Sequence, residues 1–179
     1  TATSISDLTE VMNIGSPSLY AAFGSKEALY AEALRHYCER YDAFVWTNFA
    51  AAKTARESVG ALLMDSAVAL TGSSKREDPL GCMVMLSAVG NEGHAKLGEL
   101  VRSTRATGLR RLEERFMRAV TEGEIDATVD VRGLARFVLA VQGGMSILAR
   151  DGASRADLEA VARFTMLGWD AQITADQYR

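Results

Sequence analysis

Apolar residues recur at intervals of three and four along almost the whole chain, and this periodicity restricts the fold more than any other feature. Only two prolines, Pro17 and Pro79, interrupt it. No segment shows the sustained alternation of polar and apolar residues that is typical of a strand. With 179 residues and a hydrophobic content of 48%, the chain can bury a sizeable core. We therefore predict an all-α protein.

Capping signals give the helix boundaries. The pattern Ser or Thr followed three residues later by Asp or Glu, which predicts a capped N-terminus, occurs at Ser4, Thr54 and Ser154. The predicted helices span 4–13, 16–24, 25–51, 54–70, 81–89, 92–122, 131–151 and the region from 154 onward. The buried positions expected in the first helix are Ile5, Leu8, Val11 and Met12. The polar segment 71–79 is the clearest loop.

The stretch NIGSPSLYAAFGSK at 13–26 contains a helix of about two turns between two turn-prone clusters. So short a helix is unstable in water unless other parts of the protein hold it. Leu19 and Phe23, four residues apart, are expected to pack inward. The residues expected to face outward are Ser16, Pro17, Ser18 and Tyr20. A helix, a tight turn and a second short helix predict a helix-turn-helix, whose second helix enters the major groove of DNA.

The segment SISDLTEVMNIGSPSLYAAFGSKEALYAEAL resembles the DNA-binding domain of the TetR family of transcriptional regulators over residues 3–34. The resemblance implies that Ser4, Tyr20 and Lys26 bind phosphates. It also implies that bases are reached by Ser6, Ser16, Pro17 and Ser18. The rest of the chain resembles the family's regulatory domain in the number and lengths of its helices. We therefore expect a DNA-binding domain at 1–45 and a ligand-binding and dimerisation domain at 46–179.

Two departures from the family pattern bear on DNA recognition. Asn13 replaces the usual glycine of the turn, which asparagine tolerates because it accepts positive φ. Ala21 and Ala22 replace larger polar residues, so the second helix has no Arg, Asn or Gln for bidentate base contacts. The family also has a helix ahead of Ser4. We expect it in the gene product, because its absence uncovers Leu8, Val11 and Leu19.

The charge, cysteine and histidine content argues against several kinds of functional site. The net charge is −3, and residues 1–52 alone carry three basic against six acidic side chains. DNA binding must therefore depend on geometry rather than on a basic patch. The cysteines, Cys38 and Cys82, form no metal motif, and His36 and His94 have no catalytic partners at a recognisable spacing. We predict a cytoplasmic protein without enzyme activity, metal, cofactor or membrane span.

The middle of the chain contains candidate effector residues. The resemblance implies an apolar cavity for a small apolar or amphipathic effector, lined by Trp46, Phe49, Met83, Leu86, Phe116 and Phe137. Such side chains at helical spacing are also typical of an ordinary core. Cys82 near a helix start is a candidate redox or electrophile sensor, or a buried apolar thiol. The basic run at 102–118 is interpreted as a solvated helix face.

The last two helices carry more apolar surface than a terminal hairpin needs, which predicts a two-fold homodimer. The predicted function is thus a DNA-binding regulator, a repressor released from a palindromic operator by a small effector. The alternatives are a sensor acting through Cys82 and a helical ligand-binding protein without DNA activity.

Overall fold

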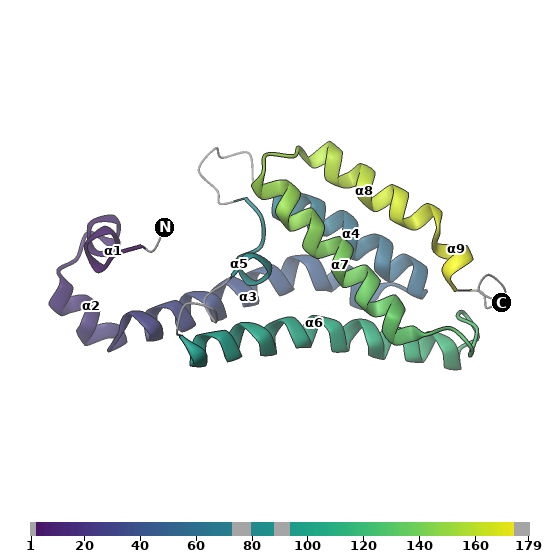
Figure 1. Cartoon of the computed structure of the whole chain (residues 1–179), viewed down its shortest axis with the longest axis horizontal. Helices are drawn as coiled ribbons and strands as arrows, with labels where there is room; N and C mark the ends of the chain where they lie inside the picture. Colours follow the sequence, from purple (N-terminus) through teal and green to yellow (C-terminus); the bar gives the residue numbers. More distant parts are fainter. Residues whose placement is uncertain (1–2, 73–79, 88–93, 174–179) are drawn as a thin grey trace. The chain divides into compact units, whose positions relative to one another are not determined.

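The computed structural model describes residues 3–72, 80–87 and 94–173. Within these residues the regular structure is helical (Figure 1), as the sequence predicts. The helices are α1 (Ile5–Met12), α2 (Ser16–Phe23), α3 (Lys26–Ala51), α4 (Ala55–Leu70), α5 (Met83–Leu86), α6 (Ala95–Thr121), α7 (Val131–Arg150), α8 (Arg155–Leu167) and α9 (Trp169–Gln172). The chain divides into two compact units, Thr1–Glu39 and Arg40–Arg179, and the division falls inside α3.

The predicted helix starts are confirmed at α1, α4 and α8. Each begins with a complete capping box, formed by Ser4 with Asp7, Thr54 with Glu57, and Ser154 with Asp157. In each box the cap hydroxyl accepts a backbone N–H and the carboxylate accepts the cap residue's own N–H, which satisfies two otherwise unbonded donors.

Several predicted boundaries differ from the structure. The helix expected at 81–89 is a single turn, α5, and the segments 73–79 and 88–93 lie outside the described residues. The last helix is interrupted at Gly168, and a separate short helix, α9, begins at Trp169. The side chain of Trp169 is buried in the core. The burial expected in α1 is wrong. None of its residues is buried, and Val11 is 86% exposed.

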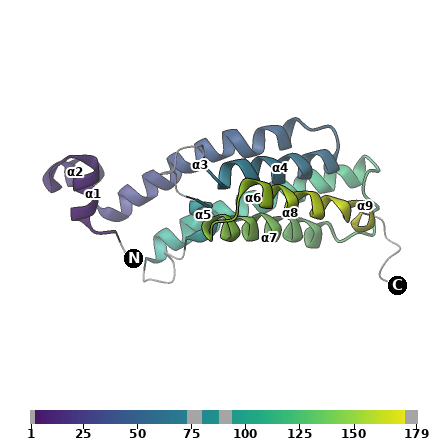
Figure 2. The same ribbon diagram turned by 90° about the horizontal axis from the view of Figure 1, so that it is seen from above.

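The second unit is built around α4 and α7. Figure 1 shows α7 running between α6 and α8, and it contacts both. Helix α4 runs alongside α8 (Figure 2) and contacts α7, α8 and α6. The inward face of α4 is the predicted one: Val59, Leu62, Leu63, Ala67 and Leu70 are buried. Phe116 of α6 packs against Trp169, with ring centroids 5.8 Å apart.

Of the described helices, α7 alone is long and apolar enough to cross a membrane by length and composition, with a mean hydropathy of 1.2 in its most apolar window. A core helix meets the same two criteria. Leu134, Val138 and Met145 of α7 are buried in the core, whereas Phe137, Ile147 and Leu148 of the same helix are exposed.

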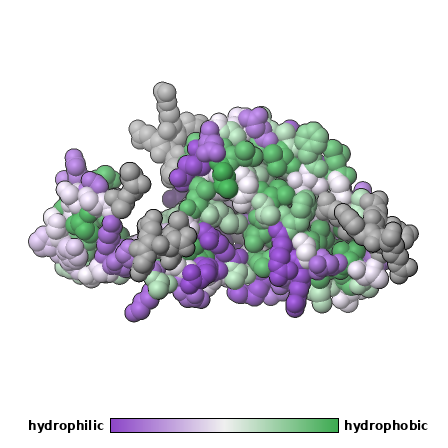
Figure 3. Space-filling model, in the orientation of Figure 1, coloured by the Kyte–Doolittle hydropathy of each residue, from purple (hydrophilic) through white to green (hydrophobic). Residues whose placement is uncertain are grey.

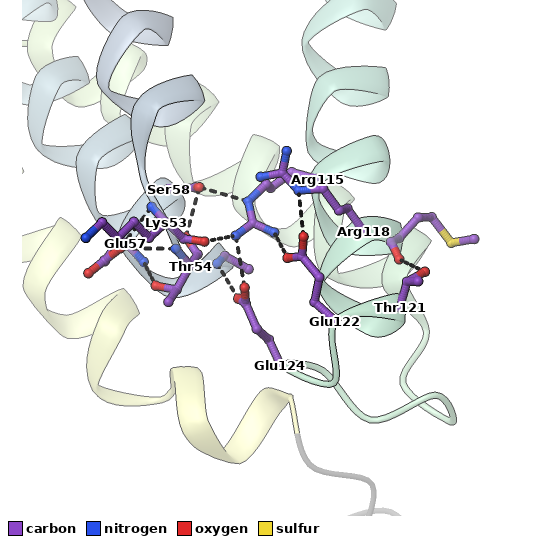
Figure 4. A network of polar contacts seen from close by, with 11 residues as sticks. Lys53, Thr54, Glu57, Ser58, Arg115, Arg118, Thr121, Glu122 and Glu124 are labelled. Carbon is purple, nitrogen blue, oxygen red and sulfur yellow. Dashed lines mark hydrogen bonds and ion pairs between the residues drawn. The ribbon is translucent and has the colours of Figure 1, made fainter.

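A buried arginine ties α6 to the start of α4 (Figure 4). Arg115 is 4% exposed, and its guanidinium donates to Ser58 Oγ at 3.1 Å, to the Lys53 carbonyl at 3.0 Å and to Glu124 at 3.2 Å. Glu124 also accepts the N–H of Ala55. The interpretation of 102–118 as a solvated face is therefore wrong at this position, because Arg115 lies on the buried stripe of α6.

Neighbouring groups shift the ionisation of Glu124. Partial burial raises the pKa of its carboxyl, but the hydrogen bonds from Ala55 and Arg115 and the positive charge of Arg115 outweigh burial. The pKa is lowered overall. A carboxyl whose pKa is lower in the folded state stabilises the fold above its unfolded pKa, and this contribution is lost as the pH falls through the folded pKa.

Replacing Glu124 with glutamine is expected to lower the free energy of unfolding at pH 7 by about 1.5–3 kcal/mol, the range for a hydrogen bond to a charged group. The difference from the wild type should shrink below about pH 4, where the carboxyl protonates. Urea unfolding at several pH values measures both effects. Glu122→Gln is the control, because Glu122 is 47% exposed and 3.8 Å from Arg115. A constant difference at all pH values would contradict the linkage.

Candidate nucleic-acid interface

The first unit presents α2 on a tight turn. The turn begins at Asn13, which has φ 51° and donates its N–H to the carbonyls of Glu10 and Thr9. It continues through Ile14 to Gly15, the extended N-cap of α2. The predicted left-handed conformation of Asn13 is confirmed. Asparagine adopts it at little cost, so a glycine is not needed at this position.

One buried side chain holds α2. Leu19 is fully buried and is the only buried residue of the helix, while Phe23 is half-buried. The prediction that these two residues face inward is confirmed most clearly for Leu19. Of the three residues expected to be uncovered, Leu19 is buried, Leu8 is half-buried and Val11 is exposed, so that expectation is wrong for Leu19. Gly24, at φ 77°, ends the helix.

The seven candidate DNA-binding residues are all exposed on this unit: Ser4, Ser6, Ser16, Pro17, Ser18, Tyr20 and Lys26. They come from the start of α1, from the outer side of α2 and from the first residue of α3. Tyr20 is 47% exposed. Proline in the first turn of α2 leaves no backbone donor unbonded, because it has none. The contacts of all seven candidate residues with DNA stay a prediction.

The charged groups around these residues are mostly committed to each other. The hydrogen bonds with Ser4 lower the pKa of Asp7, and Lys26 adds a smaller effect in the same direction. Arg35 of α3 bonds Glu32 and Glu39. Lys26 is the other Lys or Arg side chain among the described residues of this unit, and its contact with a phosphate stays a prediction.

A groove of about 640 Å³ in the second unit is lined by residues of α3 and α6, Trp46 and Phe49 among them. The two rings pack edge to face with centroids 5.0 Å apart. The Arg111 guanidinium lies 5.1 Å from the Trp46 ring centroid and binds Asp42 at 2.7 Å. The sequence does not indicate this Asp42–Arg111 pair, because its partners are 69 residues apart.

The other predicted effector residues lie outside this groove. Phe116 is fully buried in the core. Met83 and Leu86 are half-buried on α5, and Phe137 is 41% exposed on α7. The groove therefore unites two of the six predicted residues, and the role of all six in binding stays a prediction.

Cys82 is buried, and its backbone N–H donates to Ser146 Oγ at 2.7 Å. Further hydrogen bonds hold the same segment: Arg105 of α6 donates to the carbonyls of Val84, Met85 and Ser87. Gln142 donates to Ser66 at 2.9 Å beside Tyr41, whose pKa is raised by burial and, less strongly, by Cys82. A buried thiol in a packed segment fits the apolar interpretation of Cys82, and the sensor alternative stays a prediction.

Comparisons with known proteins fit this architecture. The transcriptional repressor ComR of Escherichia coli K12 is 31% identical over 170 residues, which cover 94% of this chain and 80% of ComR. A solved structure of a cysteine-substituted CifR, a TetR family regulator bound to 26-bp double-strand operator DNA, is 34% identical with a TM-score of 0.84. The match spans 93% of this chain and 86% of the CifR chain. The chain belongs to the TetR family of transcriptional regulators.

More distant relatives support the same fold. A TetR regulator from Chloroflexus aurantiacus matches with a TM-score of 0.79 at 23% identity, over 96% of this chain and 85% of that one. No protein-family model matches the chain. The protein is a DNA-binding transcriptional regulator of the TetR family, and its relatives are regulators rather than enzymes.

Proposed function

We propose that this TetR family member is a homodimeric repressor that binds a palindromic operator and leaves it when a small amphipathic effector binds. The outward face of α2 supports the DNA-binding part of the proposal, because it is exposed on a helix held by one buried leucine. Residues 1–45 act as the DNA-binding domain and residues 46–179 as the regulatory domain. Two α2 helices, one from each subunit, enter successive major grooves about 34–36 Å apart.

The DNA contacts divide into two classes. Ser4, Tyr20 and Lys26 bind phosphates and set the position of the protein, whereas Ser6, Ser16, Pro17 and Ser18 reach base edges. The hydroxyl oxygen of Ser4 accepts the Asp7 N–H, which holds this side chain at the exposed start of α1. Lys26 adds the positive charge that makes binding depend on salt.

The full-length protein is expected to retard a fragment of its own promoter in a gel, with affinity falling as the salt concentration rises. Lys26→Ala should weaken binding severalfold and reduce the slope of log K against log salt by about one for each phosphate that the lysine no longer neutralises. Lys96→Ala removes the same charge from an exposed position on α6 and is the control. Equal effects of the two variants would contradict the role of Lys26.

The exposed apolar residues on α7 and α8 support dimerisation. Phe164 is 75% exposed and Leu167 is 77% exposed on α8, while Ile147 and Leu148 are exposed on the adjoining α7. The hydrophobic area over these helices is visible in Figure 3. Leu134 of α7, Leu158 of α8 and Trp169 of α9 are instead buried in the unit's own core.

Placing a charge in this surface should separate the subunits. Phe164→Glu is expected to convert the protein from dimer to monomer in sedimentation equilibrium, because the carboxylate would have to give up its water on association. Met117→Glu introduces the same charge at a 58% exposed position on α6 and should leave the dimer intact. A wild-type protein that sediments as a monomer would exclude the dimer altogether.

The groove between α3 and α6 is the proposed effector site. Trp46 and Phe49 give it an aromatic floor, and Arg111, Arg118 and Glu114 give it polar groups. A ligand with one apolar and one polar side fits this lining. Because α3 contributes residues to both compact units, a ligand that alters its packing near Trp46 can shift the protein towards a conformer with weaker DNA binding.

The dye 1-anilinonaphthalene-8-sulfonate is a suitable amphipathic probe of this groove. Trp46→Ala is expected to weaken dye binding about fivefold, the value of one aromatic pair. Phe44→Ala truncates a half-exposed aromatic side chain of α3 that does not line the groove and serves as the control. Unchanged dye fluorescence with Trp46→Ala would exclude the groove as the binding site.

A further inference from the structure

The outward face of α2 has an apolar centre. Pro17 and Ala21 are four residues apart, so they lie next to each other on one side of the helix. Both are exposed, and they lie opposite the side defined by Leu19 and Phe23. Ser18 and Tyr20 flank this pair. A base edge that meets the middle of the helix would therefore meet a proline ring and a methyl group.

The side chains of α2 offer few ways to distinguish bases by hydrogen bonds. The helix reads SPSLYAAF and has no Arg, Lys, Asn or Gln. Serine hydroxyls both donate and accept, so they bond to either kind of base edge and discriminate weakly. An apolar group, in contrast, has one distinctive partner in the major groove, the C5-methyl group of thymine.

The charge of this unit adds little attraction to DNA that could compensate for the few hydrogen bonds of α2 to bases. Residues 3–39 contain two Lys or Arg against five Asp or Glu. One of the two, Arg35, is bonded to Glu32 and Glu39. Within this unit, short-range contacts of α2 must therefore supply a large share of the preference for one DNA sequence over another.

We propose that Pro17 and Ala21 form an apolar pair that recognises thymine methyl groups in each operator half-site. The inference rests on the proposed function, because it requires α2 to enter the major groove. It assigns a specificity role to Ala21, whose small size lets the helix approach the base edge closely enough for its methyl group to touch that of thymine. The predicted target is a half-site with thymine facing the centre of α2.

The test begins with the full-length wild-type protein. Its binding site is selected from a random-sequence duplex pool, and the selected duplex is then resynthesised with uracil replacing thymine at one position at a time. Uracil keeps every hydrogen-bonding group of thymine and lacks only the methyl. At one or two positions in each half-site, uracil is expected to weaken binding about fourfold, the value of one buried methyl group.

Two matched variants locate the contact. Ala21→Gly and Ala22→Gly each remove one exposed methyl group from the same turn of the same helix and carry the same reduction in helix propensity. Ala22 lies about 100° around the helix axis from Ala21 and one turn from buried Leu19. At the thymine that Ala21 contacts, Ala21→Gly should bind the thymine and uracil duplexes equally, whereas Ala22→Gly should keep the fourfold difference at every sensitive position.

The outcomes are separable. No selected duplex at all would mean that the proposed function fails, whatever the role of Ala21. A selected site whose affinity is unchanged by uracil at every position would overturn the inference and leave the proposed function intact, and this result does not depend on any variant folding. Disappearance of the thymine preference in Ala22→Gly rather than Ala21→Gly would also overturn it.

Discussion

The burial of Leu19 is the contact on which the DNA-facing surface depends. An isolated helix of eight residues does not persist in water, because nucleation costs more than so few hydrogen bonds return. A single fully buried side chain fixes the side of α2 that faces inward, and the periodicity of the helix then fixes the opposite side. Pro17 and Ala21 lie at the centre of that outward side.

The second unit uses polar contacts at its helix junctions and apolar contacts in its core. Arg115 and Glu124 join α6 to the beginning of α4. Three further pairs hold the later part of α3: Asp42 with Arg111, Asn48 with Asp65, and Tyr41 with Gln142. These hydrogen bonds have narrow geometric limits, so they fix how the later part of α3 packs on its neighbours. In the function that we propose, a ligand in the groove at Trp46 acts by changing this packing, because α3 belongs to both units.

Local chemistry makes the capped helix starts predictable, whereas helix ends and burial are predicted unevenly. Capping boxes at Ser4, Thr54 and Ser154 depend on residues three positions apart, so the sequence displays them directly. The misplaced residues depend on what packs against them. Periodicity marks Val11 as apolar but does not show whether anything covers it. The charge of Arg115 suggests solvent exposure, although its position on the stripe of Leu112 and Ala119 places it inside.

The sequence by itself determined the all-helical class, the capped starts, the turn at Asn13 and the outward residues of α2, because each follows from interactions within about four residues. Tertiary structure decided which apolar faces form the core and which stay exposed. It buried Trp169 beside Phe116, left Phe164 and Leu167 on the surface, and brought Trp46 to Arg111 across 65 residues of chain. Contacts between distant segments depend on how whole helices pack, and no local pattern encodes that arrangement.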